Sequence, residues 1–140
     1  AFPGGITLRR EYERLVKSED APALMARPLA CPGITDLPEL GLRVVCRLAE
    51  TAENSEICFT VAPQGDLWVR SRQAGDTLRL PGGSRSLKKL FIDRRIPAGD
   101  RDRIPVVVDS QGVLGVWGIG PNRDRVSKEI PAVQICFEKI

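Results

Sequence analysis

The chain has 140 residues, 42% of them hydrophobic and 28% charged, with a formal net charge of +3 at pH 7. This length and composition are typical of one folded domain with its own core and exclude a disordered tail. No apolar run approaches the roughly 18 residues of a transmembrane helix, and the opening Ala1-Phe2-Pro3-Gly4-Gly5 is unlike a signal peptide. We therefore expect a cytoplasmic protein, and the missing initiator methionine indicates a piece of a longer chain.

The first forty residues give weak structural signals. Alternation of apolar and polar residues favours a strand over residues 6–17, although the charge spacing there also allows a helix. Residues 19–40 contain four prolines and no sustained period. We expect a loop there, with one short strand near residues 27–31.

Most of the remaining chain alternates in the manner of short strands. The first of these strands places Leu42, Val44, Cys46 and Leu48 on one side, which we expect to face the core. The predicted strands are residues 42–50, 57–62, 67–72, 77–80, 106–108, 113–117 and 133–139. Polar turns separate them, and residues 109–112 are typical of a tight hairpin turn. This inventory predicts an α+β fold, mainly an antiparallel β-sandwich of short strands with one or two short helices.

The four cysteines form no C-x-x-C pair, and the chain has no histidine. Cys46, Cys58 and Cys136 lie in apolar, strand-like runs, whereas Cys31 lies in the proline-rich region. We interpret the cysteines as small buried hydrophobic residues in a reducing compartment, not as disulfide partners or metal ligands.

A short helix is predicted over residues 86–95. Leu87, Leu90 and Phe91 form one apolar stripe, which must pack on a sheet because so short a helix is marginal alone. Ser84 or Ser86 is a suitable N-cap. Pro97 ends the helix, since the residue before a proline avoids the α region.

Gly82 and Gly83 precede this helix and predict a phosphate-binding turn, because backbone N–H groups at a helix N-terminus attract anions. The same residues also fit a plain tight turn beside a solvated basic face. The charge balance favours the first interpretation. Ten basic and four acidic residues lie between Arg70 and Arg103, a local charge of +6 in a chain of +3, which indicates a polyanionic partner.

The same region carries an ordered series of short motifs. They are Gly75-Asp76, Arg79, Pro81, Ser86-Leu87-Lys88-Lys89, Phe91, Ile96-Pro97, Arg101-Asp102-Arg103-Ile104-Pro105 and Val116-Trp117-Gly118. In this order they resemble the C-terminal domain of bacterial tRNA(Ile)-lysidine synthetase. The resemblance covers roughly residues 67–138, about half of the chain. The opening PGGITLRREYERL is similar to the segment upstream of that domain.

The resemblance implies a sandwich domain related to one in the β subunit of phenylalanyl-tRNA synthetase. Residues 67–140 would be this domain, and residues 1–66 would lead into it and pack with it as one unit. A missing N-terminal domain of the parent ligase would use ATP, with magnesium, and lysine to make lysidine at the first anticodon cytidine. The SGGxDS phosphate loop of that domain is absent here. We therefore expect this chain to hold no cofactor and to be non-catalytic alone.

The implied partners are a minor isoleucine tRNA, gripped around its acceptor stem, and the parent's own N-terminal catalytic domain, with neither DNA nor a membrane. The predicted phosphate contacts are Arg79, Gly82, Gly83, Arg85, Lys88, Lys89, Arg95, Arg101 and Arg103. Each arginine or lysine also fits a packing or ion-pairing role. The turn Ala98-Gly99-Asp100 departs from the bulkier residue expected in the family, which puts a contact by that turn in doubt.

Two other functions fit the same residues. The chain is also consistent with a docking or homodimerisation module of the same enzyme, in which the basic segment makes internal ion pairs. A stand-alone RNA-binding protein would require a start codon immediately before Ala1.

Asp100 and Asp102 are expected to pair with nearby arginines instead of forming an acid/base couple. Trp117 is expected in the core, although it also suits stacking on a base.

Overall fold

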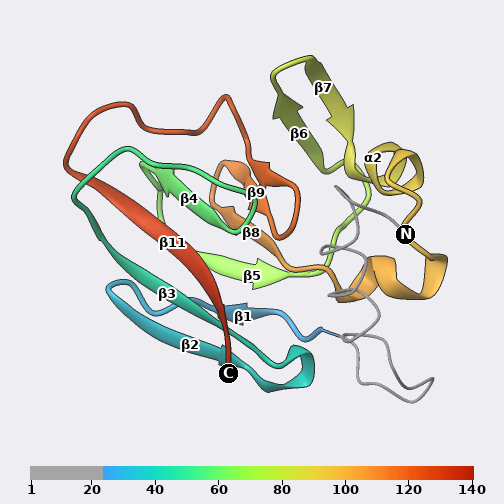
Figure 1. The fold of residues 1–140 in the computed structure, drawn as a ribbon, viewed down its shortest axis with the longest axis horizontal. Coiled ribbons are helices and arrows are strands. Elements are labelled where there is room, and N and C mark those ends of the chain that lie inside the picture. The colour runs from blue at the N-terminus through green and yellow to red at the C-terminus, as the bar shows by residue number, and fades with distance from the viewer. Residues whose placement is uncertain (1–23) are drawn as a thin grey trace, which may run out of the picture.

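Two antiparallel sheets form a sandwich in this computed structural model, which describes residues 24–140 (Figure 1). The four-stranded sheet, in the order β2-β3-β11-β4, comprises β2 (Gly33–Leu37), β3 (Leu42–Ala49), β11 (Ala132–Lys139) and β4 (Cys58–Val61). The five-stranded sheet, in the order β1-β5-β8-β9-β10, comprises β1 (Arg27–Pro28), β5 (Trp68–Arg70), β8 (Val106–Asp109), β9 (Gly112–Val116) and β10 (Gly120–Pro121). The strand predicted over residues 6–17 lies outside the described residues.

A separate hairpin and three short helical segments complete the described chain. They are β6 (Thr77–Leu80), β7 (Gly83–Ser86), α2 (Leu87–Asp93) and the 3-10 segments η1 (Pro38–Leu40) and η2 (Ala98–Arg103). In Figure 1 the hairpin and α2 project from one end of the sandwich. This architecture confirms the predicted α+β sandwich of short strands with few helices. No helix within residues 24–140 is long and apolar enough to cross a membrane.

The two sheets meet closely where β4 faces β9. Phe59 of β4 is fully buried and packs edge to face on Phe137, with ring centroids 6.2 Å apart. A Cβ atom added to Gly115 of β9 would lie 2.6 Å from two atoms of the Phe59 ring. Glycine is therefore required at position 115 by the close approach of the opposite sheet.

The run Val106-Val107-Val108 in β8 is buried at every position. Because consecutive residues of a strand face opposite sides, both faces of β8 must be covered. Leu78 of β6 and Phe91 of α2 belong to the same hydrophobic cluster as these valines. The hairpin and α2 therefore belong to the core and are not a loose appendage.

Several sequence predictions fail at the edges of the four-stranded sheet. The loop expected over residues 19–40 contains the edge strand β2, in which only Leu37 is buried, so its apolar pattern is weak. Leu48 was expected in the core but is 71% exposed. The strand β2 ends opposite Cys46, which leaves Leu48 beyond the end of its neighbouring strand.

The prediction of unpaired cysteines is wrong for two of the four. Cys58 and Cys136 lie directly opposite each other on β4 and β11, which places their side chains together, and they form a disulfide. Cys31 is free but exposed, whereas Cys46 is free and buried as predicted. Burial, reinforced by the neighbouring Cys31, raises the pKa of the Cys46 thiol to about 12. Within residues 24–140 no group of three or more potential metal ligands is gathered.

Candidate nucleic-acid interface

The helix α2 begins and packs largely as the sequence predicts. Ser86 is its N-cap, and the Ser86 hydroxyl oxygen accepts a hydrogen bond from the Lys89 backbone N–H at 3.2 Å. Leu87, Leu90 and Phe91 are buried, which confirms the predicted apolar stripe. The Leu87 N–H donates to the Asp76 carbonyl oxygen at 2.9 Å. Two N–H groups of the first helical turn therefore already have protein partners.

The helix is shorter than the predicted range of residues 86–95, because it ends at Asp93. Arg95 adopts a left-handed backbone conformation with φ of 57°. The next N–H group, that of Ile96, then donates back to the Phe91 carbonyl oxygen at 3.0 Å. This reversal buries Ile96, and the Arg95 side chain stays exposed.

The glycine turn lies elsewhere than expected. Gly82 and Gly83 form the tip of the β6–β7 hairpin, where Leu80 pairs with Gly83. Gly83 has a φ of 130°, which other residues rarely adopt. The strand β7 separates this tip from α2, so the prediction that the glycines open the helix is wrong. A tRNA contact at the two glycines stays a prediction, but the contact would be made by the end of the hairpin and not by the helix N-terminus.

The remaining predicted cations fall into an exposed group and a structural group. Arg79, Lys88, Lys89 and Arg95 are exposed, and their side chains make no ion pair or hydrogen bond within the described part of the chain. They all lie in residues 77–95, which we call the hairpin–helix segment. Arg85 lies there too but pairs with Asp93 at 2.9 Å, with each side chain about half exposed.

Arg94 and Arg123 were not among the predicted contacts, yet both are exposed and their side chains have no partner within residues 24–140. The Arg123 N–H donates to the Arg79 carbonyl oxygen at 2.8 Å, which brings the loop after β10 beside the hairpin. Arg79 and Arg123 are far apart in the sequence, so the sequence does not predict that they are neighbours. Only the pairing of segments in the fold reveals it.

Arg101 and Arg103 hold the fold together instead of facing solvent. Arg101 donates through Nε to the Ile96 carbonyl oxygen at 2.9 Å. Arg103 is only 6% exposed and donates through Nη2 to the Glu39 carbonyl oxygen at 2.9 Å. Burial raises the pKa of the nearby Asp100 carboxyl, although Arg103 opposes the shift. These contacts fit the packing role that the sequence left open for both arginines, and a tRNA contact at either one stays a prediction.

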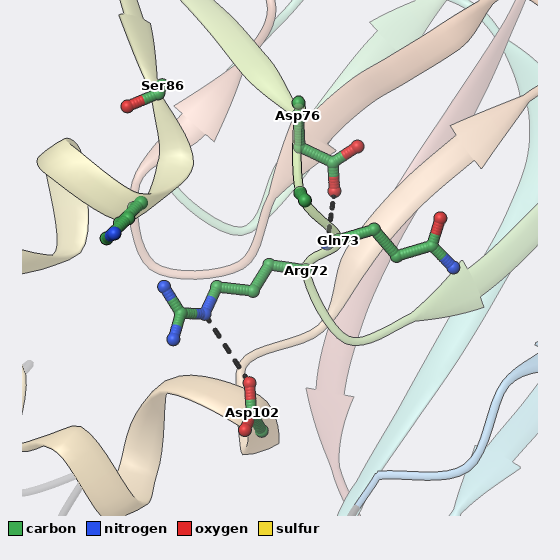
Figure 2. Close-up of a pocket in the computed structure, with 8 residues that line it drawn as sticks. Arg72, Gln73, Asp76, Ser86 and Asp102 are labelled. Atoms are coloured by element: carbon green, nitrogen blue, oxygen red, sulfur yellow. Dashed lines mark hydrogen bonds and ion pairs between the residues drawn. The ribbon is translucent and has the colours of Figure 1, made fainter.

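A cleft of about 400 Å³ lies between the loop after β5, the beginning of α2 and η2 (Figure 2). Its lining residues are Arg72, Gln73, Ala74, Gly75, Asp76, Ser86, Lys88 and Asp102. Arg72 donates through Nε to Asp102 at 3.4 Å. The Arg72 guanidinium carbon also lies 5.7 Å from the centre of the Phe91 ring. Arg72 therefore joins the loop, α2 and η2, and Asp102 pairs with an arginine as predicted, although a distant one.

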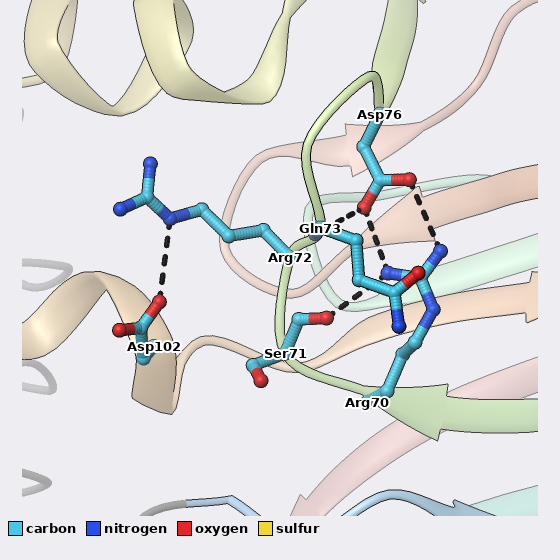
Figure 3. Close-up of polar contacts among 6 residues, drawn as sticks. All are labelled: Arg70, Ser71, Arg72, Gln73, Asp76 and Asp102. Carbon is cyan, nitrogen blue, oxygen red and sulfur yellow. Dashed lines mark hydrogen bonds and ion pairs between the residues drawn. The ribbon is translucent and has the colours of Figure 1, made fainter.

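The Asp76 carboxylate in this cleft is already neutralised (Figure 3). Arg70 donates to both of its oxygens, at 2.7 and 3.0 Å, in a bidentate pair. The Gln73 N–H donates to the same carboxylate at 2.7 Å. From the sequence, Arg70 and Arg72 were expected only to add to the positive charge of residues 70–103. No local pattern marks their contacts, because Arg70 ends β5 and Arg72 lies in the loop that follows, and Figure 3 shows the two side chains directed to opposite sides.

Comparison with known proteins identifies a family for the segment that contains these features. Residues 67–135 match the family model described as the TilS substrate C-terminal domain. They belong to the C-terminal domain family of tRNA(Ile)-lysidine synthases. This confirms the resemblance seen in the sequence, and the family segment contains the cleft and the hairpin–helix segment.

Curated lysidine synthases extend the similarity beyond that segment. The tRNA(Ile)-lysidine synthase of Geobacillus kaustophilus is 32% identical over an alignment of 130 positions, which covers 84% of this chain and 28% of that protein. The Symbiobacterium thermophilum synthase is 30% identical over an alignment of 141 positions, which covers 89% of this chain and 29% of that protein. The chain thus spans less than a third of the length of these relatives.

A solved structure shares the architecture. It is described as the crystal structure of a TilS C-terminal domain, and it is 25% identical to this chain with a TM-score of 0.68. The match covers 83% of this chain and 98% of that one. The sandwich with its hairpin and short helix is therefore the fold of the lysidine synthase C-terminal domain.

Proposed function

We propose that this chain is the tRNA-binding part of a tRNA(Ile)-lysidine synthase and contacts phosphates of the tRNA body around the acceptor stem. The observation that carries the proposal is the set of unpartnered cations on the hairpin–helix segment. Lys88 and Lys89 follow one another on the exposed side of α2, and Arg79 and Arg95 flank them in sequence. These cations do not have to give up an internal partner before they bind a polyanion.

The contrast with the paired arginines supports this assignment. Arg70 and Arg103 already bond to oxygen atoms of the protein, so a phosphate would have to compete with those oxygens. Exposed cations instead gain by releasing the counterions that surround RNA. The net charge of residues 77–95 is +5, which is larger than the +3 of the whole chain. Recognition of A-form RNA relies on such backbone contacts and on shape.

The rest of the enzymatic reaction belongs to the part of the parent protein that precedes this chain. In the proposed parent, a cytoplasmic ligase, an N-terminal domain binds ATP with magnesium and joins lysine to the first anticodon cytidine of a minor isoleucine tRNA. This chain holds the tRNA body and contributes no catalytic group. Its partners are then that tRNA and the parent's own catalytic domain. We expect it to bind neither DNA nor a membrane.

Binding of the purified chain to a minor isoleucine tRNA transcript, measured by fluorescence anisotropy over a salt series, tests the proposal. We expect the logarithm of the association constant to fall with the logarithm of salt concentration, with a slope of about −3 to −5. An acceptor-stem minihelix should reproduce most of this binding, and a DNA duplex of the same sequence should bind more weakly. Failure to bind tRNA at low salt would refute the proposal. Salt-insensitive self-association in sedimentation would instead favour the dimerisation module.

A further inference from the structure

The cleft beside α2 contains hydrogen-bond donors that the fold leaves unused. Arg72 bonds to Asp102 only through Nε, and its Nη1 and Nη2 atoms have no hydrogen-bond partner within residues 24–140. Figure 2 shows these two terminal nitrogens directed away from Asp102. The side chain is 24% exposed, and two contacts hold it, the bond to Asp102 and the Phe91 ring.

The support around Arg72 restricts its orientation. The bond to Asp102 fixes the Nε edge, and the Phe91 ring lies against the guanidinium at 5.7 Å. Phe91 itself is fully buried. A guanidinium that is fixed in this way loses little conformational entropy when it binds a second oxyanion through its free edge.

Two further donors line the same cleft. The Ser86 oxygen accepts from the Lys89 N–H, which leaves its own hydroxyl hydrogen available to donate. Lys88 is exposed, and its side chain has no partner within the described residues. The cleft is therefore lined by a planar arginine fork, a lysine and a serine, which are donors of the kinds that phosphate oxygens accept from.

The acidic residues of the cleft do not oppose an anion strongly. Asp76 is neutralised by its bidentate pair with Arg70 (Figure 3). Asp102 is 69% exposed and pairs with Arg72. Counting these two pairs as neutral leaves Lys88 as the net charge of the cleft. The cleft is open beside Gly75, because a Cβ atom added to this residue would meet no atom within 4 Å.

We infer that this cleft is a binding site for one phosphodiester group of RNA, held jointly by Arg72 and Lys88, with Asp102 positioning the arginine. The inference rests on the proposed tRNA-binding function and deepens it, because it adds Arg72 to the contacts and assigns two cations to the same phosphate. A shared phosphate has a specific consequence. Loss of either cation, or of both, removes one phosphate contact and not two.

The salt slope of tRNA binding distinguishes these cases. We expect Arg72→Gln and Lys88→Gln each to make the slope less steep by about one. Each should weaken binding about tenfold, since each removes a charge-assisted hydrogen bond. The double variant should also lower the slope by about one. Arg47→Gln is the matched control, because Arg47 lies in β3 of the four-stranded sheet and is exposed; it should leave the slope unchanged.

Either of two results on tRNA overturns the shared site. A wild-type slope in folded Arg72→Gln excludes Arg72, and a slope lowered by about two in the double variant shows separate phosphates. Lys88→Gln provides a test that is independent of folding, because the Lys88 side chain makes no ion pair or hydrogen bond within residues 24–140.

A titration with inorganic phosphate, followed by NMR, separates failure of this inference from failure of the proposed function. We expect phosphate to shift the Arg72 Nε–Hε signal and the Ser86 and Lys88 amide signals, and not the Arg47 Nε–Hε signal. These shifts without any tRNA binding would refute the proposed function and leave an anion site that serves another phosphate. No shift at Arg72 together with a wild-type salt slope in Arg72→Gln would overturn the site itself.

Discussion

Charged side chains are used differently in the sandwich and in the hairpin–helix segment. In the sandwich, the Asp109 side chain is fully buried and accepts hydrogen bonds from both terminal nitrogens of Arg125. It also accepts from the backbone N–H groups of Gln64, at 2.7 Å, and Gln111, at 2.9 Å. On α2, by contrast, the side chains of Lys88 and Lys89 have no hydrogen-bond or ion-pair partner within residues 24–140. The net charge of a segment therefore says less about function than the number of its charges that the fold leaves unpaired.

The largest expected effect on stability is that of Asp109→Ala. This substitution leaves Arg125 and two backbone N–H groups without their acceptor, which should lower the free energy of unfolding by about 3–5 kcal/mol. Chemical denaturation at neutral pH measures the loss. An unchanged stability would show that the sandwich does not depend on its internal ion pair, and the contrast with the hairpin–helix segment would disappear.

The pH dependence of the same pair sharpens the test. Burial alone would raise the pKa of Asp109, but the hydrogen bonds from Arg125, Gln64 and Gln111 lower it below its usual 3.8. A depressed folded-state pKa stabilises the fold above the unfolded-state pKa, and this stabilisation is lost as the pH falls through the folded-state value. The difference between wild type and Asp109→Ala should therefore narrow below pH 3.8. A difference that widens in acid would contradict the assigned shift.

Two substitutions on α2 test whether the hairpin–helix segment is part of the core. Leu90 is 3% exposed, whereas Ile92 on the same helix is 48% exposed. Leu90→Ala should cost about 2–5 kcal/mol because it leaves a cavity. Ile92→Ala should cost well under about 1 kcal/mol, because an exposed side chain buries little area and alanine favours the helix. Equal losses in thermal unfolding would mean that α2 does not pack as described.

A smaller effect is expected where the two sheets approach most closely. Gly115→Ala places a methyl group 2.6 Å from the Phe59 ring, so the ring or a strand must move. Overpacking of this kind costs about 1–3 kcal/mol. Gly82→Ala is a suitable control, because a Cβ atom there meets nothing within 4 Å. Thermal unfolding of the two variants should differ clearly, and a neutral Gly115→Ala would show that the sheets are further apart.

Local patterns predicted the amphipathic helix and one hairpin. The apolar stripe of Leu87, Leu90 and Phe91 was found because its burial follows the helical period. The hairpin around residues 109–112 was found from the composition of its turn, because the strands on both sides of it are buried without a period of two. The strand β7 was missed, because its sequence GSRS carries no apolar residue. It exists because its backbone pairs with β6 across a tight turn, and such pairing of a polar strand leaves no trace in hydrophobic periodicity.

Local patterns also predicted part of the candidate site. The exposure of Lys88 and Lys89 follows from their position on the helix, opposite the buried stripe. The sequence did not distinguish Arg103, which is buried beside Glu39, from the exposed arginines, because the contact joins residues 64 positions apart. It also missed the disulfide between Cys58 and Cys136, whose registry depends on β11 lying beside β4. Pair formation between distant segments decides which charges and thiols remain free.

The most direct test of this account reverses charge in the two regions compared. Lys88→Glu combined with Lys89→Glu changes the charge of the hairpin–helix segment, and Arg47→Glu combined with Lys128→Glu makes the same change at exposed positions in β3 and in the loop before β11. We predict that the first variant loses tRNA binding by about a hundredfold or more at moderate salt, with a melting temperature close to that of wild type. The second should bind nearly as wild type does. Equal losses in both variants, or a large loss of stability in the first, would contradict the claim that the unpaired cations of the hairpin–helix segment bind RNA.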